Sequence, residues 1–229
     1  MKTITTKAII LRRVDFGEAD RILTLLTPDQ GKISAIAKGS RRAKSKLAGG
    51  LELFSISNIH LIDGKGELKT VVSAQLSRHF GNIVSELNRT MFAYECLKQI
   101  DQHTEHVCEE GYFSLLEASL ESLNDTSIDL RVVKAWFMSR LLVLRGAHMN
   151  LERQSNGKAF EEEANYIFDF DEMAFISHSS GNFAPKHIKF MRLLMKVSSP
   201  KNLLHVGDAG EVAVDVEPLL RQALDFARR

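Results

Sequence analysis

The residues whose types and spacing best suit chemistry lie in segment 38–46, which reads Lys-Gly-Ser-Arg-Arg-Ala-Lys-Ser-Lys. Five of these nine residues are cationic, and the others are small. Small spacers let a backbone follow a phosphate chain, and each cation can neutralise one phosphate and release a counterion. A solvated charged loop would have the same composition, but further cations lie on the flanking predicted strands. We therefore predict a DNA-binding set that comprises Arg12, Arg13, Arg21, Lys32, Lys38, Arg41, Arg42, Lys44 and Lys46.

Aromatic side chains are scarce near this set. Residues 1–80 contain only Phe16, Phe54 and Phe80, and we expect Phe54 and Phe80 to belong to the core. Bases would then find few stacking partners, so the predicted grip is on the backbone, with poor sequence selectivity. For five contacts with single-stranded DNA, a fourfold rise in salt should weaken binding on the order of a hundredfold.

A second basic segment, 186–196, alternates cations with apolar residues. A basic rim beside an apolar groove would suit an acidic peptide with a hydrophobic end. An amphipathic helix that shows its charges to water fits the pattern equally well. The predicted peptide-contacting cations are Lys186, Lys189, Arg192 and Lys196.

Metal ligation and catalysis are poorly supported by the sequence. His103, His106, Cys108 and Glu109 lie close together, but no second cluster follows at the spacing of structural zinc sites. The acidic run 169–172 is explained more simply as a charged hairpin tip. No phosphate loop, nucleophile elbow or dinucleotide fingerprint is present, so we predict that the protein is not an enzyme and holds no metal.

The elements that must position these residues change in character at Phe80. Before it, short runs rich in Ile, Val, Leu and Thr are broken by turns at 28–31 and 63–66. Five strands without a helical period favour a small closed barrel of the oligonucleotide-binding fold, since an open sheet would need its edges covered. We therefore predict an α+β protein in which 1–79 is this barrel and 80–229 is mostly helical.

Beyond Phe80 the apolar period becomes 3.6 residues, which predicts helices. Three of them are expected to form a bundle, and Pro185 and Pro218 are placed as first-turn residues of two more. Two alternating runs around Ile167 and Phe175 could pair as a small hairpin. The inward face predicted for the first helix consists of Phe80, Ile83, Val84, Leu87, Met91, Tyr94 and Leu97; the other helices are predicted at 112–120, 130–144, 186–197 and 218–228.

Charge is unevenly divided along the chain. Residues 1–80 hold 14 Lys and Arg against 7 Asp and Glu, whereas residues 81–229 hold 16 against 22. The first part should therefore attract polyanions and the second should not. We find no apolar run of membrane-spanning length and no secretory cleavage pattern, so we expect a cytoplasmic, nucleoid-associated protein whose two cysteines, Cys96 and Cys108, are reduced.

Several motifs in the first 80 residues resemble those of the RecO family of recombination mediators. The order and spacing of these motifs carry the resemblance, which covers residues 5–80 well and the helical remainder mainly in its general pattern. They are Gly17-Glu18-Ala19-Asp20-Arg21, Leu23-Thr24-Leu25-Leu26-Thr27, Gly31-Lys32-Ile33, Ala37-Lys38-Gly39-Ser40-Arg41-Arg42, Lys44-Ser45-Lys46-Leu47, Leu51, Phe54 and Gly66-Glu67-Leu68.

The resemblance implies a protein of DNA repair and recombination that binds single- and double-stranded DNA and anneals complementary strands. It further implies contact with the acidic tail of single-stranded-DNA-binding protein (SSB) and cooperation with RecR in loading the RecA recombinase. Lys38, Arg41, Arg42, Lys44 and Lys46 correspond by position to the family's basic DNA-binding loop.

Many members of that family carry a four-cysteine zinc module in the second domain, and this sequence departs from the pattern in region 150–187. The positions of the two cysteine pairs read Leu151-Glu152-Arg153-Gln154-Ser155-Asn156-Gly157-Lys158 and Gly181-Asn182-Phe183-Ala184-Pro185-Lys186-His187. We therefore predict that no zinc is bound. Two other functions stay open at this stage: an RNA-binding or translation-associated barrel, and an adaptor whose loop docks an acidic protein.

Overall fold

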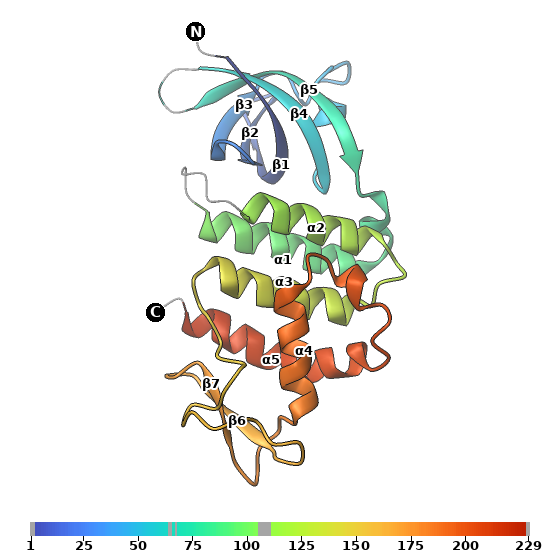
Figure 1. The fold of residues 1–229 in the computed structure, drawn as a ribbon. Helices are drawn as coiled ribbons and strands as arrows, with labels where there is room; N and C mark the ends of the chain where they lie inside the picture. Colours follow the sequence, from blue (N-terminus) through green and yellow to red (C-terminus); the bar gives the residue numbers. More distant parts are fainter. Residues whose placement is uncertain (1–2, 64–65, 67, 105–110, 228–229) are drawn as a thin grey trace. The chain divides into compact units, whose positions relative to one another are not determined.

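The chain divides into two compact units, Met1–Asn124 and Asp125–Arg229. The computed structural model describes residues 3–63, 66, 68–104 and 111–227 (Figure 1). The predicted boundary after residue 79 coincides with the end of the last barrel strand at His79, whereas contacts divide the chain after Asn124. Two helices therefore belong to the same unit as the barrel.

Five strands form the closed barrel that the sequence predicts. They are β1 Thr3–Phe16, β2 Asp20–Thr27, β3 Gly31–Ala37, β4 Ser55–Ile62 and β5 Lys69–His79. Their order around the barrel is β1-β2-β3-β5-β4, and β1 pairs with β4 to close it. Only the β3–β5 pair is parallel. This arrangement is the oligonucleotide-binding fold, and closure leaves the sheet without a long open edge.

The barrel core follows from the two-residue period of the strands. Ile33, Ala35 and Ala37 are buried, while the residues between them are only half-buried. Leu23 on β2 and Ile59 on β4 also belong to the core cluster. The predicted turn before β3 is confirmed, because Gly31 has a positive φ of 64° and Thr27 Oγ1 accepts a hydrogen bond from Gln30 N at 3.1 Å.

Helix α1, Leu87–His103, is present, but its predicted inward face is largely wrong. Leu87, Met91 and Tyr94 are 74%, 62% and 51% exposed. A competing stripe of Phe92, Cys96 and Ile100 is buried instead, together with Leu97. Residues spaced by four lie on one helical face, so this helix has two apolar stripes. The second stripe is the one that is buried in the folded protein. Residues 80–86 also differ from prediction, since Gly81–Ser85 is a 3-10 turn.

The expected bundle of three helices is divided between the two units. Helix α2, Tyr112–Asn124, packs on α1 in the first unit. Helix α3, Leu130–Leu144, packs in the second unit on α4, Pro185–Lys196, and α5, Ala209–Phe226. The helices at 130–144 and 186–197 are thus confirmed, and Pro185 is a first-turn residue as predicted.

Pro218 is an interior residue of α5, not a first-turn residue as predicted. Its ring nitrogen cannot donate to the carbonyl four residues earlier, that of Val214. Val214 itself is half exposed. The helix continues through the proline, supported by buried Val212, Val216 and Leu220.

Region 150–184 contains the predicted hairpin, β6 Tyr166–Asp169 and β7 Ala174–Ser177. Aromatic rings from this region pack edge to face. The ring centres of Phe168 and Phe183 lie 4.9 and 5.4 Å from the ring centre of Phe175. At the hairpin tip, Asp169 Oδ1 accepts hydrogen bonds from two backbone amides, as in an ordinary charged turn. In the part of the chain that the structure describes, no helix has the length and hydropathy of a membrane span.

Candidate nucleic-acid interface

Segment 38–46, called the basic loop from here on, follows β3 and is fixed to the β1–β2 turn. Gly39 N donates to the Asp20 carboxylate at 2.7 Å. Arg41 N donates to Ala19 O at 2.9 Å, and Arg41 Nη1 donates to Gly17 O at 3.3 Å. Three contacts from two loop residues therefore define where the cations emerge.

The basic loop is itself a series of tight turns. Gly39 has a positive φ of 65°, which an L side chain would strain. Arg42 N donates to Gly39 O at 3.1 Å, and Ser45 N donates to Arg42 O at 2.9 Å. The backbone is thus shaped by its own hydrogen bonds, while Lys38, Arg42, Lys44 and Lys46 are exposed to solvent.

Four of the nine predicted cations form ion pairs with carboxylates. Arg13 pairs with Glu52 at 3.0 Å and Lys32 pairs with Asp101 at 3.3 Å. Arg21 and Arg41 share the Asp15 carboxylate, at 3.1 and 3.3 Å. Exposed pairs of this kind are weak, so the arginines could exchange Asp15 for a phosphate. Lys32 also donates to the Asp101 carbonyl at 2.7 Å, which makes it a tie between β3 and α1.

The other five cations remain available to a ligand. Within the described residues, Arg12, Lys38, Arg42, Lys44 and Lys46 are exposed and form no ion pair with a carboxylate. Four of the five lie on the basic loop. Unpaired cations gathered on a single loop generate a positive potential that attracts polyanions.

The aromatic residues near the loop divide as the sequence predicts. Phe54 and Phe80 are buried, whereas Phe16, the last residue of β1, is 52% exposed. Sequence reasoning missed the two carboxylates that organise the site, Asp15 and Asp20. Asp20 is part of the motif at 17–21 and Asp15 lies just before it, but only the folded structure shows what they contact.

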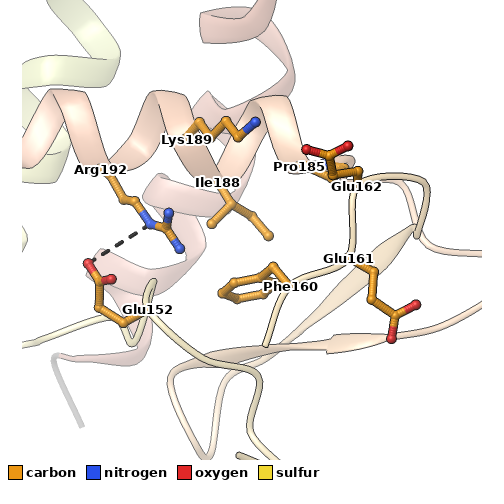
Figure 2. A pocket seen from close by; sticks show the side chains of 8 residues that line it. All are labelled: Glu152, Phe160, Glu161, Glu162, Pro185, Ile188, Lys189 and Arg192. Atoms are coloured by element: carbon orange, nitrogen blue, oxygen red, sulfur yellow. Dashed lines mark ion pairs between the residues drawn. The ribbon is translucent and has the colours of Figure 1, made fainter. Parts of the chain in front are cut away.

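The second basic segment lies on α4, and a hollow of about 330 Å³ adjoins it (Figure 2). Of the four predicted cations, only Lys189 and Arg192 line this pocket, together with Ile188 and Phe160. Three carboxylates, from Glu152, Glu161 and Glu162, line it as well.

The side chain of Arg192 contacts several residues of the second unit. Its Nε donates to Leu151 O at 2.7 Å, Nη2 donates to the same oxygen, and the guanidinium lies 5.7 Å from the centre of the Phe160 ring. An ion pair with Glu152 at 4.0 Å adds to these contacts. Lys186 and Lys196 are exposed, while the apolar partners Phe190 and Leu194 are buried in the core. The structure therefore gathers two of the four predicted residues and points the others to solvent.

Four possible metal ligands also lie close together in the sequence, at 103–109. His106, Cys108 and Glu109 lie outside the described residues, so the structure does not bear on that cluster. Among the residues that are described, no three His, Cys, Asp or Glu side chains gather as a metal site would require. Where the first cysteine pair of a zinc module would fall, buried Gln154 donates to Ala159 O at 2.8 Å and accepts from Ser177 N at 2.9 Å. The amide side chain thus joins Ala159 to Ser177, the last residue of β7.

A closed five-stranded barrel with a cationic loop defines the class of oligonucleotide-binding-fold proteins. The family profile "Recombination protein O N terminal" matches residues 1–80. The "DNA repair protein RecO" of Alkaliphilus metalliredigens is 30% identical over 229 residues, which are 97% of this chain and 89% of that protein. The chain belongs to the RecO family.

Two other relatives with the same printed name match a shorter stretch. The protein of Desulfatibacillum aliphaticivorans is 36% identical over 156 residues, 67% of this chain. That of Dehalococcoides mccartyi (strain ATCC BAA-2266 / KCTC 15142 / 195) is 40% identical over 152 residues, 66% of this chain. The matched part spans 60% of the first relative's length and 59% of the second's.

Proposed function

We propose that this protein binds single- and double-stranded DNA through the basic loop and Arg12, anneals complementary strands, and acts in DNA repair and recombination. The observation that supports this most strongly is a set of five exposed cations, four on one anchored loop and Arg12 on β1, which have no carboxylate partner among the residues that the structure describes. Family membership supports the role in repair. Residues 1–79 are the proposed DNA-binding domain.

The mode of DNA binding that we propose is electrostatic. Lys and Arg recognise the phosphate backbone, which all sequences share, so affinity should depend on salt far more than on base sequence. Arg21 and Arg41 would join the contact surface by leaving Asp15, and Arg13 and Lys32 would contribute mainly to the fold. Annealing needs charge neutralisation of two strands, not a nucleotide cofactor, so the proposed activity is that of a binding protein and not of an enzyme.

The first experiment measures the salt dependence of binding to single-stranded oligonucleotides. Replacing Lys38, Lys44 and Lys46 with Gln should lower the slope of log K against log salt by about 2, since each lost contact removes roughly 0.7. The control replaces exposed Lys98, Lys158 and Lys201 with Gln, an equal change in net charge outside the basic loop. Equal slopes for the two variants would contradict the site. Annealing of complementary strands without ATP should fall in the loop variant alone.

The same variants separate the alternative functions. An RNA-binding protein would prefer RNA to DNA of equal length because it would use the 2′-hydroxyl. An adaptor would bind no nucleic acid, and its loop variant would lose an acidic protein instead. Equal affinity for DNA and RNA, or a preference for DNA, supports the proposal.

The proposed partners are RecR, SSB through its acidic tail, and RecA indirectly, in loading the recombinase onto SSB-coated DNA. Family membership supports these proposed partners, and with them we propose a cytoplasmic, nucleoid-associated protein. For the tail, the proposed contacts are Lys186, Lys189, Arg192 and Lys196 on α4, of which Lys189 and Arg192 line the pocket in Figure 2. The three carboxylates of that pocket oppose an acidic ligand, so Lys189→Glu should abolish peptide binding there, whereas Glu162→Gln should strengthen it. A peptide that binds both variants equally would place the tail elsewhere.

A further inference from the structure

The outer face of the barrel beside the basic loop is apolar. On β1, the side chains of Arg12, Val14 and Phe16 alternate with those of Arg13 and Asp15, and Val14 and Phe16 are 51% and 52% exposed. A solvated sheet face is normally polar, so two large exposed apolar side chains in sequence on one strand indicate a binding surface.

The strand register extends this surface across three strands. Val14 pairs with Ile22 on β2, and Ile22 pairs with Ile36 on β3. Residues directly opposite one another project from the same face of a sheet, so the three side chains form one row. Ile22 and Ile36 are only half-buried, and neither belongs to the core cluster of the barrel.

Arg41 of the basic loop contacts the two residues that flank Phe16 in the chain. The guanidinium of Arg41 contacts the Asp15 carboxylate at 3.3 Å and donates to Gly17 O at 3.3 Å, so it reaches both neighbours of Phe16. The backbone of Phe16 therefore lies next to the basic loop, at the end of the strand that carries Val14. Arg12, at the other end of the same exposed face of β1, is also without an ion pair in the described structure.

We propose that this row is a platform for unpaired nucleobases, on which Phe16 stacks against a base while Arg12 and the basic loop hold the adjoining phosphates. The inference rests on the proposed DNA binding and names the form of DNA that this face selects. Charge decides the occupant: a flat apolar surface bordered by unpaired cations matches a single strand, which has π faces beside a polyanionic backbone. Duplex DNA keeps its bases stacked inside, so it would use the cations without the platform.

The test compares Phe16→Ala with the parent on single-stranded and duplex DNA of equal length. Affinity for the single strand should fall on the order of tenfold, because stacking on an aromatic side chain contributes about that much per base. Duplex affinity and the salt slope should stay unchanged, since no cation is lost. The matched control is Leu87→Ala, an exposed apolar residue on α1. Urea unfolding shows whether each variant keeps its fold.

Phe16→Trp supplies a direct readout. The natural chain has one tryptophan, Trp136, which is buried, so the new indole would report on the platform. Oligo(dT) should quench its fluorescence, and a duplex should not. A parent that binds no DNA would overturn the proposed function and the platform with it. A parent that binds DNA while Phe16→Ala binds single strands as tightly, or loses single strands and duplex equally, would overturn the platform alone.

Discussion

The Asp20 carboxylate accepts a hydrogen bond from the backbone N–H of Gly39 at 2.7 Å, which joins the first residue of β2 to the second residue of the basic loop. A carboxylate beside a proposed phosphate-binding surface repels the ligand, so its presence needs a structural reason. The hydrogen bond is that reason, because it fixes the point at which the cations leave β3.

Replacing Asp20 separates these two effects. Asp20→Ala should weaken DNA binding several-fold although it removes a negative charge, because the loop loses its anchor. Asp20→Asn keeps an oxygen acceptor and should bind DNA at least as tightly as the parent. Oligonucleotide titrations of both variants at one salt concentration measure the effect. If the Ala variant binds more tightly than the parent, the anchor has no role in binding.

Asp15 should act in the opposite direction, because it neutralises Arg21 and Arg41. Asp15→Asn retains a weak acceptor for the guanidinium groups and removes the competing charge. We expect tighter binding and a salt slope that steepens by up to roughly 1.4, since each of the two arginines can add one phosphate contact worth about 0.7. An exposed carboxylate elsewhere, Glu172, supplies the control as Glu172→Gln. An unchanged slope would mean that neither arginine reaches DNA.

Gln154 should contribute measurably to the stability of the second unit. Its side chain is 1% exposed and satisfies two backbone groups, Ala159 O and Ser177 N. Gln154→Ala leaves both without that partner, at a cost of about 1–3 kcal/mol. Urea unfolding followed by Trp136 fluorescence reports on this unit, because Trp136 lies on α3. Exposed Gln222→Ala should leave the transition unchanged, and equal effects from both variants would contradict the assignment.

Cys96 should be inert in the folded protein. Burial raises the pKa of its thiol, and the nearby Glu95 carboxylate raises it further, so little reactive thiolate forms. In a Cys108→Ser variant, Cys96 is the only thiol in the chain. An aromatic disulfide reagent at pH 8 should release no chromophore until urea unfolds the first unit. Immediate reaction in native buffer would show that α1 opens readily.

Patterns that are local in the sequence predicted the structure well. The alternation of 32–37 is the observed strand β3, and the turn at Gly31 follows from the conformational freedom of glycine. The helices at 130–144 and from Pro185 also formed where the apolar period indicated. Each of these features depends on residues within a few positions of one another, so the chain itself carries the information.

Where the sequence contains two equivalent patterns, local spacing could not show which face of a helix is buried or where a helix begins. Helix α1 has two apolar stripes, and only packing in the first unit determined that Phe92, Cys96 and Ile100 are buried while Leu87 and Met91 are exposed. Pro218 could begin a helix or lie inside one. Helix α5 continues through it, with buried residues on both sides of the proline.

The sequence by itself determined the barrel, the concentration of positive charge at 38–46 and the membership in a family. Which cations are free was decided only by the tertiary structure. Lys32 meets Asp101, 69 residues away, and Arg13 meets Glu52, 39 residues away, because strand register and helix packing bring them together. Charge is a property of each residue, whereas its neutralisation depends on partners that are distant along the chain and adjacent only after folding.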